Sequence, residues 1–503
     1  MTPHSDAHVP APLPAHDHAT ARPHDHGHGH GHGHDHGHGA APDPALPRRW
    51  TALALLCAAQ FMLVLDVTVV NVALPAIADD LHLGRTALTW VITAYTLCFG
   101  GLMLLGGRLA DALGARRVLL TGLALFTAAS LLCGLAPNAG VLIGGRIAQG
   151  VGAALLSPAA LALVTTLFHG PDRSRALGVW AAIGGTGSAV GVILGGALTD
   201  GPGWSWIFFL NVPVGLVLLA VLPRVLPVTA PRRARLDVPG ALLVTAATGA
   251  LVYGLVRAGD TGWTSTATLL PLLAAPVLYG LFAKAEKAAA APLMDPRMFT
   301  RRPVVAGSLL MLVATGLLIS FFFLGSALLQ HVHHLSALRT GLLFLPVALA
   351  TAVGAHLGSR LVGTVGPRAL ATAGAGVTAL ALLPLALLPA DAGPWTTLLP
   401  ALSAAALGLG AVFVTATTTA LGLTAPHEAG LASGIVNTSH ELGGTLGVAA
   451  VSTLAAPALQ GPDPATFTTA FTLLTTTAAL TTLLAPALVP KGTPHLTTGP
   501  HAH

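Results

Sequence analysis

The sequence predicts an all-α polytopic membrane protein with fourteen transmembrane helices. Three observations support this class. Only 9% of the 503 residues are charged and 53% are hydrophobic, whereas a soluble domain carries about 25% charged residues. Long apolar runs alternate with short charged or Gly/Pro-rich joints, and a run of about twenty apolar residues can cross a bilayer. Lysine and arginine collect in every second joint, as they do in cytoplasmic loops.

The apolar runs give the order of the helices. If the N-terminus is cytoplasmic, the outer joints hold only Arg85, Arg257 and Arg339, and the inner joints hold most of the other basic residues. This bias predicts an even number of spans and both termini in the cytoplasm. We expect the protein in the plasma membrane. The predicted spans lie near residues 50–76, 87–106, 117–136, 140–167, 175–198, 205–226, 237–257, 266–284, 303–329, 340–364, 368–389, 395–423, 431–455 and 467–489.

The runs divide into two sets of six, with two further runs inserted between them. The joint at 358–368 weakly repeats the joint at 107–117, and paired halves related by a pseudo-two-fold axis are common in secondary transporters. We therefore expect five regions: a disordered His-rich cytoplasmic tail (1–47), a first six-helix half (48–226), two inserted helices with a linker (227–300), a second six-helix half (301–490) and a short cytoplasmic tail (491–503).

The N-terminal tail is rich in Pro, Ala and His, with His and Gly alternating up to His38. Such a composition cannot bury a hydrophobic core. Neutral imidazoles bind Zn, Ni and Cu, so His24, His26, His28 and His30 are candidates for weak metal capture. The alternative is a low-complexity tail without a function of its own.

Composition and motifs also exclude several classes of function. Cys57, Cys98 and Cys133 lie in apolar runs, so they indicate neither a disulfide framework nor a metal site. The positive charge sits in short joints, as a topology signal does, and does not indicate nucleic-acid binding. The sequence contains no ATP-binding loop of the Gly-x-x-x-x-Gly-Lys-Ser/Thr type. Transport would therefore use an ion gradient, and we expect neither an enzyme nor a cofactor.

The first predicted span contains the most informative polar residues. Asp66 lies deep within the apolar run and Asn71 follows it by about one and a half turns. An ionised carboxylate in hydrocarbon is costly, so Asp66 should face the bundle interior or a watery cavity. The alternative is a helix-end residue that caps or snorkels, but Asp79 and Asp80 mark the aqueous end better. Pro75 adds a candidate break near the end of the helix.

The joint after the second span is short and charged. It contains Gly107, Asp111, Gly114, Arg116 and Arg117. The glycines suit a tight turn, and Asp111 can pair with an arginine or accept from a helix N-terminus. A pair that forms in one conformation and breaks in another would act as a gate. The alternative is an ordinary positive-inside loop.

Three later spans carry further candidates. Arg146 lies about one turn into the fourth span, where it either snorkels or compensates a buried carboxylate. Asn437 and Glu441, next to His440, share a face of the thirteenth span, and an intramembrane glutamate is a functional-site hypothesis. The alternative for this pair is wetting by the cytoplasm. In the fifth span, four glycines form a smooth face that allows close helix packing: Gly187, Gly191, Gly195 and Gly196.

These stretches resemble the major facilitator superfamily, in particular its fourteen-helix branch of drug:proton antiporters. The resemblance covers about residues 50–490 and rests on Leu-Asp-x-Thr-x-Val-Asn-x-Ala-Leu-Pro from Leu65, Gly-x-Leu-Ala-Asp-x-x-Gly-x-Arg from Gly107, Arg-x-x-Gln-Gly-x-Gly-Ala-Ala from Arg146 and the glycines of the fifth span. The sequence departs from the family pattern in having Ala112 and Ala115 in place of basic residues, Val192 in place of a proline, and His440-Glu441 in place of a basic or amide pair.

The resemblance implies a proton-coupled antiporter that exports hydrophobic, often cationic small molecules by alternating access. It also implies that Arg146 takes part in proton coupling. One alternative is a dedicated exporter of a single self-made metabolite. A less favoured one is divalent-metal efflux fed by the His-rich tail, because the spans lack a constellation of His, Asp and Glu. The expected partners are the substrate, protons and the lipid bilayer, and the expected functional unit is a monomer.

Overall fold

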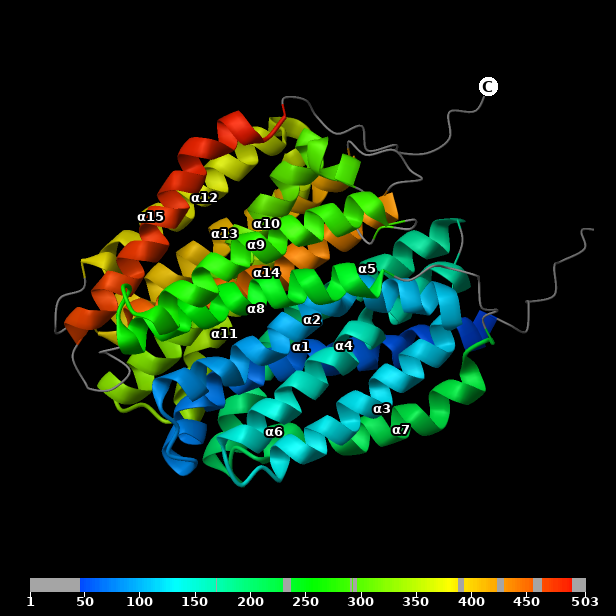
Figure 1. Cartoon of the computed structure of the whole chain (residues 1–503), viewed down its shortest axis with the longest axis horizontal. Helices are drawn as coiled ribbons and strands as arrows, with labels where there is room; N and C mark the ends of the chain where they lie inside the picture. The colour runs from blue at the N-terminus through cyan, green and yellow to red at the C-terminus, as the bar shows by residue number, and fades with distance from the viewer. Residues whose placement is uncertain are drawn as a thin grey trace, which may run out of the picture. The chain divides into compact units, whose positions relative to one another are not determined.

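The described part of the chain consists of helices joined by short turns. The computed structural model describes residues 46–168, 170–228, 237–289, 292, 296–387, 393–422, 429–455 and 464–490, and Figure 1 shows their arrangement. The helices are α1 (Leu46–Asp80), α2 (Arg85–Leu113), α3 (Ala115–Gly134), α4 (Ala139–Leu167), α5 (Gly170–Asp200), α6 (Trp206–Phe209), α7 (Asn211–Val225), α8 (Val238–Thr261), α9 (Thr266–Ala288), η1 (Pro296–Thr300), α10 (Arg302–Ala327), η2 (Leu328–Val332), α11 (Ala337–Val365), α12 (Pro367–Ala386), η3 (Pro394–Leu398), α13 (Leu399–Gly422), α14 (Ala429–Leu454) and α15 (Pro464–Leu488).

Within these residues, twelve helices are long and apolar enough to cross a membrane. The two remaining predicted runs are occupied by α5, with 31 residues, and α14, with 26 residues. The sixth predicted run is divided at Leu210 into α6 and α7, because Pro213 has no N–H to donate to the carbonyl of Phe209.

The expected break at Pro75 is wrong, since α1 continues through it as far as Asp80. A proline within a transmembrane helix is tolerated where neighbouring helices satisfy the freed backbone groups. Pro75 leaves the carbonyl of Asn71 without its helical partner, and the Gln330 side chain donates to the next carbonyl, that of Val72, at 2.9 Å. Asp79 and Asp80 are both exposed, which agrees with their expected place at an aqueous end.

The turns after α2 and α11 depend on glycine. Gly114 has φ +94° and Gly366 has φ +81°, a backbone conformation that L side chains rarely adopt. Each glycine is followed directly by the next helix, α3 and α12 respectively. The two joints that resemble one another in sequence therefore turn in the same way.

The inserted hairpin of α8 and α9 lies on one side of the bundle. α8 packs against α2 and α14, whereas α9 packs chiefly on α8 (Figure 1). Most of the large apolar side chains of α9, such as Leu270 and Leu273, are exposed, as is normal for a helix that contacts lipid. Elsewhere, α5 packs on α11 and α10 packs on α14.

Candidate functional site

A buried ion pair joins α1 to α4. The Arg146 guanidinium donates from Nη1 to Oδ2 of Asp66, and both side chains are 1% exposed. Neither residue reaches the protein surface, so neither caps a helix end nor snorkels to an interface. The structure thus brings together two of the residues selected from the sequence, 80 positions apart.

Neutral amides complete the coordination of the carboxylate. Nε2 of Gln149 and Nδ2 of Asn211 each donate to Oδ1 of Asp66 at 3.1 Å. The Gln149 amide also donates to Oγ of Ser130 at 2.8 Å, and its Oε1 accepts from Arg146 at 2.9 Å. We call Asp66, Ser130, Arg146, Gln149 and Asn211 the carboxylate network. Its members come from α1, α3, α4 and α7.

The guanidinium has further partners that fix its plane. Its Nε donates to the carbonyl of Val91 at 2.9 Å, and its Cζ lies 4.3 Å from the centroid of the Tyr95 ring. A planar guanidinium is suited to such combined stacking and forked hydrogen bonding. The carboxylate of Asp66 therefore balances the charge of Arg146 and accepts hydrogen bonds from the arginine and two amides. Loss of the carboxylate charge would leave the arginine without its counter-ion.

Gln149, Asn211 and Ser130 were not among the predicted site residues. A signal existed for Gln149, because it follows Arg146 by three positions and so shares its helix face. Asn211 is also a polar residue within an apolar run. Ser130 had no such signal, since serine is common in membrane helices and often bonds its own backbone. Here it does so as well, donating to the carbonyl of Phe126 at 2.8 Å.

A separate cavity of about 820 Å³ lies between helices of the two predicted halves. Thr68 and Thr96 lie at one end of its lining, and Arg108 and Asp111 at the other, so it extends along α2 toward the α2–α3 turn. Its wall is mainly apolar, as in most small-molecule sites. The other lining residues that contribute polar or aromatic groups are Gln60, Phe99, Ser157, Thr165, Trp180, Thr315, Ser433, Asn437, His440 and Glu441.

One acid of α14 lies against the inner part of this cavity. The side chain of Glu441 is 14% exposed, and Nδ1 of His440 lies 3.2 Å from its Oε1. Asn437, one turn earlier, lines the cavity too. Gly100 of α2 allows this arrangement, because a Cβ there would lie 2.6 Å from Cβ of Glu441. Asn437 and Glu441, expected on one face of the helix, thus both line the cavity.

Two polar centres, the carboxylate network and the cavity around Glu441, lie on opposite sides of α1. Leu63, Val64, Val67 and Thr68 of α1 line the cavity, whereas Asp66 points the other way, into the carboxylate network. Asp66 does not line the cavity itself. A movement of α1 would therefore change both the cavity wall and the carboxylate network.

The gate residues of the α2–α3 turn are placed differently from one another. Gly107, Arg108 and Asp111 line the cavity near its end, and Nη2 of Arg108 donates to the carbonyl of Pro292 at 2.7 Å. Arg116 donates instead to the carbonyl of Pro223 at the end of α7. Arg117 is exposed, and within the described residues Asp111 has no ion-pair partner.

The glycine face of α5 packs mainly on α1. A Cβ at Gly187, Gly191 or Gly195 would contact Val64, Thr68 or Val69, respectively. Gly196 lies instead against the backbone of Leu338 in α11. The other residue of the α1 motif, Asn71, bonds within its own helix, since its Nδ2 donates to the carbonyl of Val67 at 2.8 Å.

At the end of the helices remote from the α2–α3 turn, the two predicted halves are joined by hydrogen bonds. The carboxylate of Asp200 accepts from the backbone N–H groups of Ala337 and Leu338 at 3.0 and 2.8 Å. Gln330 reaches α1 in the same region. We call this end the sealed end. The His24–His30 part of the tail, residues 229–236 of the linker before α8 and residues 491–503 lie outside the described residues.

Comparison with known proteins identifies relatives over most of the chain. The family model described as the Major Facilitator Superfamily matches residues 56–448. The puromycin resistance protein of Streptomyces alboniger is 41% identical over 417 residues, covering 81% of this chain and 82% of that protein. The cephamycin export protein of Amycolatopsis lactamdurans is 38% identical, covering 82% of this chain and 86% of that protein.

The fold is also similar to that of solved transporters. A bacterial homologue of the human lysosomal transporter Spinster, in its inward-facing and unoccupied conformation, aligns with a TM-score of 0.61 at 15% sequence identity. The alignment covers 88% of this chain and 98% of that structure. At this level of identity the comparison concerns the fold alone.

Proposed function

Because this chain is a multi-pass membrane protein that belongs to the Major Facilitator Superfamily, we propose that it exports hydrophobic, often cationic small molecules in exchange for protons. The names of its relatives, which refer to puromycin resistance and cephamycin export, support antibiotics as the substrate class. The observation that carries the proton-coupled part is the carboxylate network, a fully buried acid and arginine that both lie within the membrane-spanning helices.

The proposed topology has fourteen spans. Counting α6 and α7 as one span, the remaining long helices α1–α5 and α8–α15 bring the number to fourteen. The distribution of Lys and Arg supports a cytoplasmic position for both termini and for the α2–α3 turn. The sealed end then faces outward, and the cavity extends toward the cytoplasm.

In the proposed cycle, Asp66 carries the proton. With Asp66 ionised, Arg146, Gln149 and Asn211 hold α1 against α4 and α7. Protonation removes the counter-ion of Arg146 and weakens this attachment. Since α1 also lines the cavity, its release would change the cavity wall at Val67 and Thr68 and favour the conformation that opens outward.

Glu441 is the proposed contact for the charge of a cationic substrate. It lines the cavity, and Nδ1 of His440 lies 3.2 Å from its Oε1. An ammonium that replaces water in a mostly apolar cavity interacts more strongly with a carboxylate than it would in bulk solvent. Phe99 and Trp180 offer apolar aromatic surface in the same cavity.

The α2–α3 turn is the proposed gate. Asp111 and Arg108 lie where the cavity approaches the cytoplasmic end, so closure of this end would bring new partners to Asp111. Gly187, Gly191 and Gly195 would let α5 move closely along α1, because no side chain intervenes at those positions.

A dedicated exporter of one self-made metabolite remains the second candidate. It is favoured by the names of the two relatives described above, which refer to one antibiotic each. The two candidates share a mechanism and differ in substrate range. Inside-out vesicles with an acidic lumen distinguish them: a dedicated exporter accumulates one compound, whereas a multidrug exporter accumulates puromycin and several unrelated cationic dyes. Failure to accumulate any tested compound would contradict the proposed export function.

A further inference from the structure

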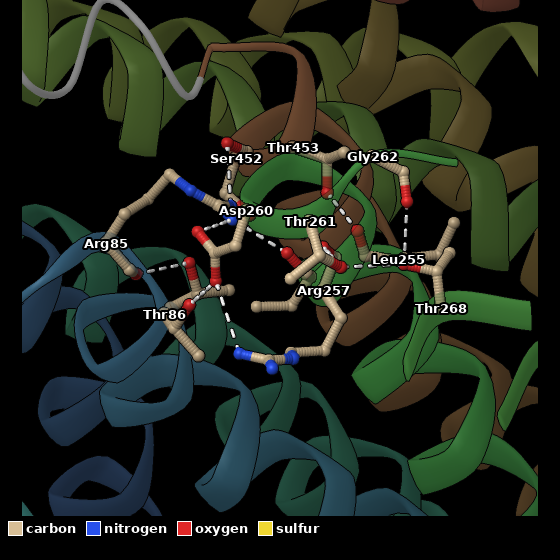
Figure 2. Close-up of polar contacts among 12 residues, drawn as sticks. Arg85, Thr86, Leu255, Arg257, Asp260, Thr261, Gly262, Thr268, Ser452 and Thr453 are labelled. Atoms are coloured by element: carbon tan, nitrogen blue, oxygen red, sulfur yellow. Dashed lines mark hydrogen bonds and ion pairs between the residues drawn. The ribbon is translucent and has the colours of Figure 1, made fainter. Parts of the chain in front are cut away.

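A buried arginine lies at the sealed end, away from both polar centres. The side chain of Arg85, at the start of α2, is 1% exposed, although its position in the sequence predicted an outer loop. Its Nη2 donates to Oδ1 of Asp260 at 2.5 Å and to the carbonyl of Val256 at 2.7 Å, both in α8. Its Nη1 donates to the carbonyl of Ser452 in α14 at 3.3 Å. Figure 2 shows that three helices meet at this guanidinium.

The tie between α2 and α8 has additional support. Thr86, next to Arg85, donates from its hydroxyl to Oδ2 of Asp260, so both carboxylate oxygens accept from α2 (Figure 2). Arg257 lies at 4.0 Å from the same carboxylate. Gly259 leaves room for the guanidinium, because a Cβ there would lie 2.8 Å from Cζ of Arg85.

The tie between α8 and α14 is weaker. It contains a hydrogen bond from Oγ1 of Thr453 to the carbonyl of Leu255, at 2.6 Å, between neutral groups. The contact also contains a small apolar cluster of Val252, Val256 and Ala449, and apolar contacts have no fixed direction. α14 and α2 are joined at this end by the longer bond from Arg85 to Ser452.

Opening of the sealed end must separate α2 from α14, and α8 is bonded to both. Parting α8 from α2 would leave Arg85 buried without its counter-ion, which is far more costly than losing one neutral hydrogen bond. Parting α8 from α14 breaks only neutral bonds and an apolar contact. The ion pair therefore decides which side the inserted hairpin follows.

We propose that the inserted hairpin α8–α9 moves with α2 as part of the first half, and that Arg85 and Asp260 are the residues that fasten it there. This inference rests on the proposed alternating-access transport. In the sealed state the hairpin spans the seam between α2 and α14, and each outward opening separates it from α14 while the α2–α8 tie stays intact.

Crosslinking tests which contact must open. In a background with Cys57, Cys98 and Cys133 replaced by alanine, one variant carries Gly101→Cys with Thr245→Cys, because a Cβ at Gly101 of α2 would lie 3.1 Å from Cβ of Thr245 in α8 and this pair leaves Arg85 and Asp260 intact. The other variant carries Leu255→Cys with Thr453→Cys. Oxidation should leave export by the α2–α8 variant nearly unchanged. It should lower export by the α8–α14 variant at least ~10-fold, because the bridge holds the sealed conformation and prevents outward opening. Reductant should restore the second. The reverse pattern, or loss in both, or loss in neither, would overturn the inference.

Spin-label distances keep the test independent of export and of the engineered bridge. Spin labels placed two at a time at Gly84, Thr264 and Leu454 report the distances among the sealed ends of α2, the hairpin and α14, with Arg85 and Asp260 intact. The distances are compared at pH 5.5 and pH 8.5, on either side of the usual working range of transport. At pH 5.5 the α2–α14 and hairpin–α14 distances should be longer by several ångström, and the α2–hairpin distance should be the same at both pH values.

The three distances also separate the two levels of proposal. A changing α2–α14 distance with a constant hairpin–α14 distance would overturn the hairpin assignment and leave alternating access standing. No change in any distance, with puromycin present or absent, would contradict alternating access and the hairpin assignment together. In Asp260→Asn the distribution of α2–hairpin distances should broaden. It should not broaden in Thr261→Ala, because Thr261 makes no contact with Arg85 in Figure 2.

Discussion

Replacing Arg146 by alanine should shift the pH dependence of export to higher pH. In the wild-type protein the arginine is the only cationic partner of Asp66 among the described residues, and both side chains are 1% exposed. Without it, the carboxylate keeps only the amide donors of Gln149 and Asn211, each at 3.1 Å. The protonated form of Asp66 is then favoured, so proton release to the cytoplasm requires a higher pH.

The size of the effect follows from the cost of breaking a buried pair. Removing one partner typically costs about 3–5 kcal/mol, and protonation of Asp66 can relieve part of it. The part of this cost that protonation does not relieve lowers the maximal export rate, by about tenfold for each 1.36 kcal/mol. The coupling should weaken as well. Without the arginine charge, the ionised and protonated forms of Asp66 differ less in how strongly they hold α1 against α4 and α7.

The assay measures export against pH in inside-out vesicles at matched expression. Arg146→Lys should lie between the wild type and Arg146→Ala, because it keeps the charge but cannot reproduce the fork to Asp66, Gln149 and Val91. The control is Arg175→Ala, whose side chain is 74% exposed in an i,i+3 pair and should change nothing. If the pH profile of Arg146→Ala equals that of the wild type, the arginine has no part in coupling.

Three further predictions concern separate parts of the mechanism. Asp66→Asn, which keeps the shape but cannot exchange a proton, should abolish gradient-driven export at normal expression; full dye export by this variant would exclude Asp66 from the mechanism. Glu441→Gln should raise the KM for cationic substrates at least ~10-fold, as loss of a charged contact of about 1.5–3 kcal/mol implies, with little effect on a neutral substrate; equal effects on both would indicate a structural role. Deleting residues 1–45 should leave export of organic cations unchanged, and a loss beyond about tenfold would mean that the tail gates or delivers substrate.

The polar centres could be predicted from the sequence because charges are rare within apolar runs. Asp66, Arg146 and Glu441 stand out for that reason, and the position of each along its run gives its depth in the membrane. The pairing of Asp66 with Arg146 was one of two alternatives that the sequence left open, the other being an arginine that snorkels to the interface. Which of the neighbouring amides would join them depends on how α3, α4 and α7 turn toward α1, and periodicity does not determine that rotation.

Arg85 shows where this reasoning fails. Topology counting treats a basic residue in a short joint as a solvated charge, and Arg85 was counted so. The structure buries it because Asp260, 175 residues later, lies on the inserted hairpin next to α2. The sequence does not specify which helices the hairpin contacts, so neither partner could be connected with the other. Likewise, the separation of Asp66 from the cavity depends on which face of α1 each neighbour meets.

Proton movement driven by substrate tests the central claim most directly. Purified protein is reconstituted into liposomes with an acidic lumen that contains a pH-sensitive dye, and puromycin is added outside. The account predicts that addition of substrate drives protons out of the lumen in the wild type, that substrate accumulates inside at the same time, and that Asp66→Asn shows neither. Accumulation of puromycin without any proton movement, or identical proton movement in Asp66→Asn, would contradict it.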